Sequence, residues 1–432
     1  MEESEENKLL KQIETLKASS QMQEAFRCIE KDSEYTLKQQ LELVKIPAFS
    51  NNEKERAIYF QKLMEEEGYP AHMDSVCNVY TTIRGTGNGP AVMMTAHLDT
   101  VFPMDTPLKI KKEGARISVP GIGDDTRGCA EILALLRVMR MCALKPVGDI
   151  IIGCNVGEEG NGNLRGMRQF FKDHPDKIDV FFSIDSAGPG ICFGGTGSHR
   201  YRVTFRGPGG HSMGAFGLVN PIHAMGRAIS LISDMRTPAH PKTTFCVGVV
   251  AGGTSVNAIA SECSMMVDLR SNGQTELKAL DEQFRSCTEK AVQAENDRWE
   301  EERGRDFEGV DYFDKTARIR AEFEQIGDRP TGSQPEGSRL VEILSAVFKA
   351  SGTEPEMLEF GSTDSNIPLS LGIPAVTVSG GGTTGDAHSL SEWYDPTDAF
   401  KGVRKNLLML FSVAGLDGVS EPIPVCLPEK FL

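Results

Sequence analysis

Residues 91–100 read AVMMTAHLDT, an apolar run that ends in His97 and Asp99. A continuous apolar run of this length predicts a β-strand that is buried on both faces of a sheet. Side chains two residues apart share a face of a strand, so His97 and Asp99 leave its end together. A histidine beside a carboxylate suits a metal ligand whose second ring nitrogen is held by that carboxylate. Alone, such a pair is more often an ordinary strand end than a metal site.

The composition is that of a soluble globular protein. The chain has 432 residues, 39% hydrophobic and 25% charged, and its length predicts two domains or one large interrupted domain. The net charge of −15 and the pI near 5.1 argue against a nucleic-acid partner, which requires a basic surface. Apolar runs of 18 residues are lacking, and the N-terminus has no signal-peptide pattern, so we expect no membrane partner.

The ten cysteines are scattered, and none forms a Cys-x-x-Cys pair. This spacing argues against a zinc ribbon and against a thioredoxin-like site. Several cysteines lie in apolar strands, where a free thiol behaves as a small hydrophobe. We therefore expect a reducing, cytoplasmic location.

Residues 1–197 predict the first part of a catalytic domain. It opens with a charged helical arm over 1–31 and a helix near 34–45, and a capping box over Ser50–Glu53 begins the next helix. Strands and helices then alternate, which predicts an α/β sheet with helices on both faces. These elements are strands 78–84 and 91–98, joined by a hairpin-like break, helix 127–143, strand 149–156, helix 163–172 and strand 180–184.

From about residue 198 the strands have one apolar face only, and from about residue 329 the first pattern returns. We therefore expect an inserted domain over 198–328 and the second part of the catalytic domain over 329–432. The order strand-helix-strand-strand-helix-strand predicts a ferredoxin-like sandwich for the insertion. Its expected elements are strands 199–206, 243–250, 262–270 and 315–323 and helices 220–235 and 275–294.

Acidic and imidazole groups follow further apolar strands or lie in glycine-rich loops. In an open α/β sheet, ligands bind beyond the carboxyl ends of the strands. A helix cap or a solvated loop would explain each group alone, but adjacent acids repel each other without a cation. Two histidines and three carboxylates can hold two zinc-type ions that polarise a carbonyl, with one acid left to move protons. The groups, besides His97, are Asp124, Glu158, Glu159, Asp185 and His388.

The chain resembles the M20 family of metallopeptidases, the peptidase T, carboxypeptidase G2 and aminoacylase group. The resemblance implies a zinc-exopeptidase-like mixed α/β sheet with helices on both faces. It also implies that the insertion over 198–328 is a dimerisation or lid domain and that the protein is a homodimer. The matching stretches are AHLDTV, GIGDDTRGCAEI, NVGEEG, FSIDSAG, GPGGHS, GGTSVNAI, VDLRS and GGTTGDAHSLSEW.

The resemblance implies ligands for two divalent metal ions, with Zn²⁺ preferred over Co²⁺ or Mn²⁺. One ion would take Asp124, Glu159 and His388. The other would take His97 and Asp185 together with Asp124, which bridges the two ions. Asp rather than Glu at position 185 is closer to the peptidases than to the aminoacylases.

Further roles follow from the same resemblance. Asp99 would orient the metal-binding histidine two residues before it, and Glu158 would be the general base. In dimeric relatives, a histidine at the position of His211 reaches the partner's active site and stabilises the oxyanion. Asn257 and Arg270 fall where relatives bind the carbonyl or the terminal carboxylate of the substrate, although a surface strand position explains Arg270 nearly as well.

Several functions stay open at this point. The first is an exopeptidase that cleaves di- or tripeptides, and the second is an amidohydrolase that acts on N-acyl or N-carbamoyl amino acids. A third reads Gly210–Gly214, GHSMG, as the G-x-S-x-G pattern of serine hydrolases with Ser212 as nucleophile. That pattern requires a buried strand before the serine and a helix after it, and neither is expected here. A non-catalytic binding protein is disfavoured because every expected ligand and the base are present.

Overall fold

The computed structural model describes residues 4–175, 177–188, 190–302 and 316–425. The chain divides into two compact units. Unit 1 comprises residues 1–195 and 332–432, and unit 2 comprises residues 196–331. Unit 2 therefore covers the range in which the sequence changes its strand pattern. Among the described helices, none is long and apolar enough to span a membrane.

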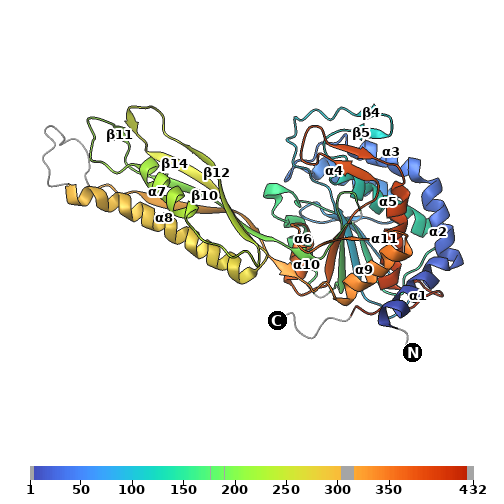
Figure 1. The fold of residues 1–432 in the computed structure, drawn as a ribbon. Helices are drawn as coiled ribbons and strands as arrows, with labels where there is room; N and C mark the ends of the chain where they lie inside the picture. Colours follow the sequence, from blue (N-terminus) through green and yellow to red (C-terminus); the bar gives the residue numbers. More distant parts are fainter. Residues whose placement is uncertain (1–3, 176, 189, 303–315, 426–432) are drawn as a thin grey trace. The chain divides into compact units, whose positions relative to one another are not determined.

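Unit 1 is built on a mixed sheet that lies among its helices in Figure 1. The sheet has eight strands in the order β1-β2-β6-β3-β7-β18-β8-β17. The central strand β3 (Val92–His97) runs parallel to β6 (Ile150–Asn155) and to β7 (Val180–Ile184), and β7 runs parallel to β18 (Ala375–Val378). The carboxyl ends of these four strands therefore meet at one end of the sheet. The outer strands are β1 (His72–Met73), β2 (Val79–Ile83), β8 (Gly190–Cys192) and β17 (Glu356–Leu358).

The expected hairpin-like connection between β2 and β3 is wrong. Strand β2 pairs antiparallel with β6, and β6 lies between β2 and β3. The reason lies in burial, because every residue of β3 is buried, whereas β2 alternates between buried and partly exposed residues. A strand that is apolar on both faces takes a central position between parallel neighbours.

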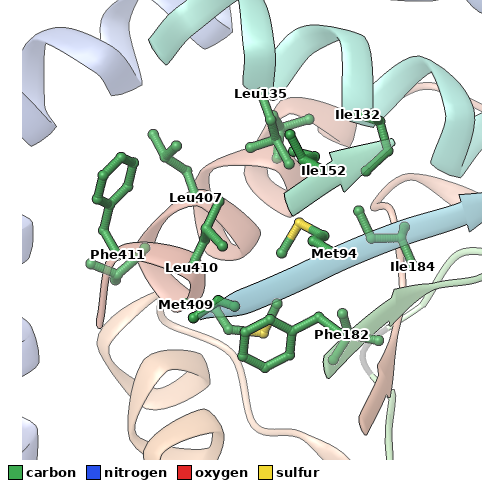
Figure 2. Close-up of a cluster of buried hydrophobic side chains, with 14 of the residues drawn as sticks. Met94, Ile132, Leu135, Ile152, Phe182, Ile184, Leu407, Met409, Leu410 and Phe411 are labelled. Atoms are coloured by element: carbon green, nitrogen blue, oxygen red, sulfur yellow. The ribbon is translucent and has the colours of Figure 1, made fainter. Parts of the chain in front are cut away.

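Three long helices cover one face of the sheet. Figure 2 shows Met94, Ile152 and Phe182, from three adjacent strands, in one cluster with Leu135 and Leu410 from two of these helices. These side chains are all buried, and close packing of this kind makes the face a single core. The helices are α5 (Thr126–Met141), α9 (Arg339–Ala350) and α11 (Ala399–Ala414).

The opposite face of the sheet has a smaller core of its own. Met93, Ile151 and Phe181 point to this side, since side chains alternate along each strand. They pack against α6 (Arg165–Asp173) and α10 (Asn366–Ser370). The expected arrangement with helices on both faces is thereby confirmed.

The N-terminal arm consists of two helices rather than one, α1 (Glu5–Ala18) and α2 (Ser20–Lys31). Ser19 separates them, and its Oγ accepts a hydrogen bond from the backbone N–H of Met22 (3.3 Å), which caps α2. The buried side chains of α1 belong to the large core of unit 1, where α1 contacts α9 and α11. The arm is therefore part of the core of unit 1.

The capping box expected over Ser50–Glu53 is not formed. Helix α4 (Lys54–Glu66) follows Glu53, whose Oε1 accepts from the backbone N–H of Asn51 (2.9 Å). Ser50 lies beside the end of β3, because Phe49 and Thr100 form a β-bridge. Its Oγ therefore donates to Asp99 (2.7 Å) instead of capping the helix. The remaining helix of this region is α3 (Ser33–Leu43).

Unit 2 is a four-stranded antiparallel sheet in the order β12-β14-β10-β15, with two helices packed on its apolar face. The expected strand and helix order is confirmed. The last strand lies later than the expected 315–323, because the polar residues after Phe323 continue the pairing with β10 as far as Arg329. The bounds are β10 (Gly197–Arg206), α7 (Pro221–Ser233), β12 (Thr243–Gly252), β14 (Glu262–Ser271), α8 (Gln274–Glu302) and β15 (Arg320–Arg329).

Short strands complete the two units. In unit 1, a four-stranded sheet in the order β19-β20-β5-β4 brings residues near 384–394 beside residues near 111–118. Its strands are β4 (Lys111–Glu113), β5 (Arg116–Ser118), β19 (Thr383–Gly385) and β20 (Trp393–Asp395). The other short elements are the pairs β9 (Gly194–Gly195) with β16 (Gly332–Ser333) and β11 (Gly210–His211) with β13 (Ala258–Ile259), and the 3₁₀ turn η1 (Gly160–Gly162).

The packing of α1 predicts that a cavity in the arm destabilises the protein. Ile13 has no exposed surface, so Ile13→Ala should lower the free energy of unfolding by about 2–5 kcal/mol. The neighbouring Glu14 is exposed, and Glu14→Ala should change it by less than about 0.5 kcal/mol. Urea denaturation followed by circular dichroism measures both. Equal stabilities of the two variants would show that α1 does not belong to the core.

Candidate metal centre

The predicted ligands gather at the end of the sheet where the parallel strands finish. His97 is the last residue of β3, Glu158 and Glu159 follow β6, and Asp185 follows β7. His388 comes from the connection between β19 and β20. Adjacent parallel strands necessarily bring such residues together, which is why ligand sites form beyond the carboxyl ends of strands.

Asp124 lies between the two histidines. Its Oδ1 is 3.0 Å from His97 Nε2, and its Oδ2 is 3.2 Å from His388 Nε2. Each oxygen of one carboxylate thus faces a different imidazole. The arrangement suits a carboxylate that is shared by two neighbouring cation positions.

Each histidine has a further carboxylate beside it. Glu159 Oε1 is 2.8 Å from His388 Nε2, and Asp185 Oδ1 is 4.0 Å from His97 Nε2. The side chains form three overlapping groups whose possible ligand atoms lie within 4.8 Å of one another. The groups are His97 with Asp124 and Asp185, Asp124 with Glu159 and His388, and His97 with Glu158 and Glu159.

Asp99 binds the protein backbone. Its Oδ1 accepts a hydrogen bond from the N–H of Glu158 (3.0 Å), and its Oδ2 accepts from the N–H of Glu159 (3.0 Å) and from Ser50 Oγ (2.7 Å). The carboxylate thereby fixes the loop that carries both glutamates. The Nδ1 atom of His97 lies 3.0 Å from the backbone carbonyl oxygen of Asp99 and 3.7 Å from its carboxylate. Asp99 therefore positions His97 and the loop of Glu158 and Glu159.

A residue to which the sequence assigned no role holds the loop of Asp124. The buried carboxylate of Glu392 accepts from the N–H groups of Gly121 (2.8 Å), Gly123 (2.8 Å) and Asp124 (3.1 Å). Its only sequence signal is its place four residues after His388 in a matched stretch. Asp125, which follows Asp124 in the chain, is the N-cap residue of α5, and its Oδ1 accepts a hydrogen bond from the N–H of Gly128. The helix-cap interpretation therefore applies to Asp125.

The electrostatics of the site favour cations. Hydrogen bonds to Asp124 and Glu159 raise the pKa of His388 to about 10. Burial and the neighbouring charge of Asp124 raise the pKa of Asp185 to about 7. The carboxylates of the site thus stabilise a positive charge on His388, while burial and a neighbouring carboxylate disfavour the negative charge of Asp185.

The residues fit two zinc-type ions. Imidazole nitrogen and carboxylate oxygen are the donors that Zn²⁺ accepts, and two ligands of a tetrahedral ion at about 2.0–2.1 Å lie roughly 3.3 Å apart. The distances of His97 and His388 to Asp124 and of His388 to Glu159 are 2.8–3.2 Å. Small displacements of these side chains would therefore bring them to the spacing of zinc ligands.

The three predicted site residues of the insertion lie in unit 2. His211 is exposed, and its Nδ1 accepts from the N–H groups of Met213 (3.3 Å) and Gly214 (3.2 Å), which places the ring proton on Nε2. Asn257 is exposed on the neighbouring turn. Arg270 donates through Nε to Asp268 (2.7 Å). His211 is therefore set to donate a hydrogen bond from Nε2.

Ser212 lacks the surroundings of a nucleophile elbow. The preceding strand β11 is two residues long and exposed, and the following residues form turns until α7. The backbone N–H of Ser212 donates to the backbone carbonyl oxygen of Asn257 (2.9 Å). The strand–turn–helix context that the G-x-S-x-G pattern requires is thus missing at this serine.

Comparison with known proteins identifies the family. A probable carboxypeptidase of Aspergillus clavatus is 24% identical over 53% of this chain, and the match spans 60% of that protein. The solved aminopeptidase PepT from Bacillus cereus has a TM-score of 0.68 and 19% identity, covering 87% of this chain and 97% of that one. A tripeptidase from Staphylococcus aureus has a TM-score of 0.70 and 21% identity, covering 88% and 98%. The two structures show the fold.

The family model of the M20/M25/M40 peptidases matches residues 93–410. This range contains the whole candidate centre and unit 2, so the resemblance predicted from the motifs is confirmed. The chain belongs to peptidase family M20/M25/M40, a family of hydrolases.

Proposed function

We propose that this protein is a two-metal hydrolase that cleaves the amide bond of short peptides as an exopeptidase. The observation that carries the proposal is the position of Asp124, whose two carboxylate oxygens face His97 and His388 separately. An ordinary helix cap or loop acid would not have an imidazole at each oxygen.

The ligand sets follow from these contacts. We assign one ion to Asp124, Glu159 and His388 and the other to His97, Asp124 and Asp185, with Zn²⁺ as first choice and Co²⁺ or Mn²⁺ as alternatives. When bound, two such ions polarise the substrate carbonyl and make water a better nucleophile near neutral pH. Asp99 and Glu392 keep the ligand loops in place.

Glu158 is the proposed general base. Its side chain is buried, and its carboxylate lies in the group that contains His97 and Glu159. The hydrogen bond from its backbone N–H to Asp99 fixes its position. Its carboxylate would accept a proton from the attacking water and deliver it to the leaving nitrogen.

His211 is proposed to act across a homodimer. Its Nε2–H would donate to the oxygen of the substrate carbonyl as negative charge develops there. Strand β12 is at the edge of the sheet of unit 2, and Val249 and Val250 on it are 50% and 56% exposed. An exposed apolar edge of this kind can pair with a second copy of the chain.

Short peptides are proposed as substrates because of the structural neighbours and of two polar residues in unit 2. The structural neighbours named aminopeptidase and tripeptidase support short peptides. Asn257 and Arg270 are the proposed contacts to a substrate carbonyl or terminal carboxylate. N-acyl and N-carbamoyl amino acids offer the same amide and carboxylate and remain the alternative, which a panel of both substrate types on metal-loaded protein would distinguish.

Substitution of each of the two adjacent glutamates distinguishes the proposed general base from the proposed metal ligand. Glu158→Gln should reduce turnover of a cleaved peptide by about 10²–10⁴-fold while both metals stay bound. Glu159→Gln is the matched control and should also lose metal, because its carboxylate faces His388. Peptide hydrolysis and metal analysis measure the two effects. Near wild-type turnover of Glu158→Gln would overturn the assignment of the base.

Metal removal distinguishes this mechanism from a serine hydrolase. Chelation should abolish hydrolysis, and Zn²⁺, Co²⁺ or Mn²⁺ should restore it. A serine-directed reagent and the variant Ser212→Ala should leave the turnover within about twofold, since Ser212 lacks the elbow geometry. The proposal fails if the chelated protein keeps its activity or if the serine reagent removes it.

Mixed dimers test the role of His211. His211→Ala and Glu158→Gln should each have very low turnover, and a mixture that exchanges subunits should regain about a quarter of the wild-type rate. Half of the dimers are then mixed, and each holds one site with both groups intact. Failure of exchanged, demonstrably mixed dimers to regain activity would contradict a role in the partner's site.

A further inference from the structure

Two cysteines from distant parts of the chain lie in contact in unit 1. Cys28 is on α2 of the N-terminal arm, and Cys142 is the C-cap residue of α5. Their Sγ atoms are 3.6 Å apart, with Cys142 donating its S–H to Cys28. Both side chains are partly exposed, so a small reagent can reach them.

We propose that Cys28 and Cys142 are a redox modification site, at which an intramolecular disulfide joins the N-terminal arm to helix α5. The sulfur atoms of a disulfide are about 2.05 Å apart. Closing the gap therefore requires a displacement of about 1.5 Å, which rotations about the two Cα–Cβ bonds can supply. The proposal is independent of the metal centre and of the proposed hydrolysis.

The reaction needs an oxidant of the disulfide class, such as glutathione disulfide. One cysteine thiolate attacks a sulfur of this reagent, forms a mixed disulfide and releases one glutathione thiolate. The second cysteine then attacks the protein sulfur of the mixed disulfide and releases the second glutathione. The two protein thiols lose two electrons and two protons in total, and the reagent gains them as two molecules of glutathione.

The surroundings of the pair indicate slow oxidation. Burial, the contact with Cys28 and the charge of Glu24 together raise the pKa of the Cys142 thiol to about 12. The Oε1 atom of Glu24 lies 3.9 Å from Cys28 Sγ, and its charge is one of the causes of the raised pKa of Cys142. Cys28 therefore makes the first attack, and Cys142 resolves the mixed disulfide.

A second pair of thiols in the described part of unit 1 does not offer the same chemistry. Cys129 and Cys154 also lie together, but both are fully buried below the end of β3, and Cys129 donates to the backbone of His97. A reagent cannot reach that pair in the folded protein. In the pair of Cys28 and Cys142, the sulfur atoms are in contact and both side chains are partly exposed to solvent.

The disulfide would increase the stability of the N-terminal arm. It closes a loop of more than a hundred residues between α2 and α5, and such a cross-link restricts the unfolded chain. The oxidised protein should therefore unfold at a higher temperature than the reduced protein, and the arm should resist proteolysis for longer.

The test is incubation of the whole protein with excess glutathione disulfide, followed by alkylation, proteolysis and mass spectrometry. The expected product is a peptide pair linked through Cys28 and Cys142, two hydrogens lighter than the reduced peptides. A rise in Tm should accompany it and disappear on reduction. Cys28→Ser and Cys142→Ser should each lose the cross-link and the rise in Tm, and the exposed Cys246 serves as matched control, since Cys246→Ser should keep both.

The rate of the reaction provides a second measurement. Glu24→Gln removes the charge beside both thiols, so the cross-link should form faster than in the wild type. The proposal is overturned if Cys28 stops at a stable glutathione adduct without a cross-link. It is equally overturned if the rise in Tm survives in Cys28→Ser.

Discussion

The candidate centre depends on the carboxylate of Asp99. Placed at the end of the central strand, it binds the backbone N–H groups of Glu158 and Glu159 and the hydroxyl of Ser50. Three segments that are far apart in the sequence are thereby held around His97. The carboxylate is fully buried, and a buried charge is tolerated only where hydrogen bonds satisfy it. The geometry of the site thus follows from the need to satisfy one buried acid.

A second constraint is electrostatic and destabilises the site, because the carboxylates around Asp124 repel one another. The carboxylates of Asp124, Glu158, Glu159 and Asp185 lie close together around two histidines. Burial and the charge of Asp124 raise the pKa of Asp185, and hydrogen bonds to Asp124 and Glu159 raise the pKa of His388. The fold opposes this repulsion with rigid supports, of which Glu392 on the loop of Asp124 is the clearest. Divalent cations would relieve the same repulsion directly.

The supports of the site extend into the N-terminal arm. Helices α1 and α2 contribute to the core that covers the sheet on the side of α5, and α5 begins directly after Asp124 and Asp125. Gln40 of α3 donates to the carbonyl oxygen of Ile122 in the same loop (2.8 Å). Helix α2 of the arm and the following helix α3 both contact α5. The N-terminal helices are thus continuous with the structure that positions Asp124, and the contact of Cys28 with Cys142 joins α2 to the end of α5.

The sequence by itself determined the α/β class, the change of pattern near residue 198 and the candidate ligands His97, Asp124, Glu159, Asp185 and His388, which the structure brings together. Apolar runs and strand-end acids are local signals, and residues in parallel strands must meet at one end of the sheet. The tertiary structure alone decided that β6 separates β2 from β3, that Ser50 binds Asp99 instead of capping α4, and that Glu392 holds the loop of Asp124. It also brought Cys28 to Cys142. These contacts join residues that are distant in sequence, and they depend on burial and on the pairing of specific hydrogen-bonding groups, which no local pattern encodes.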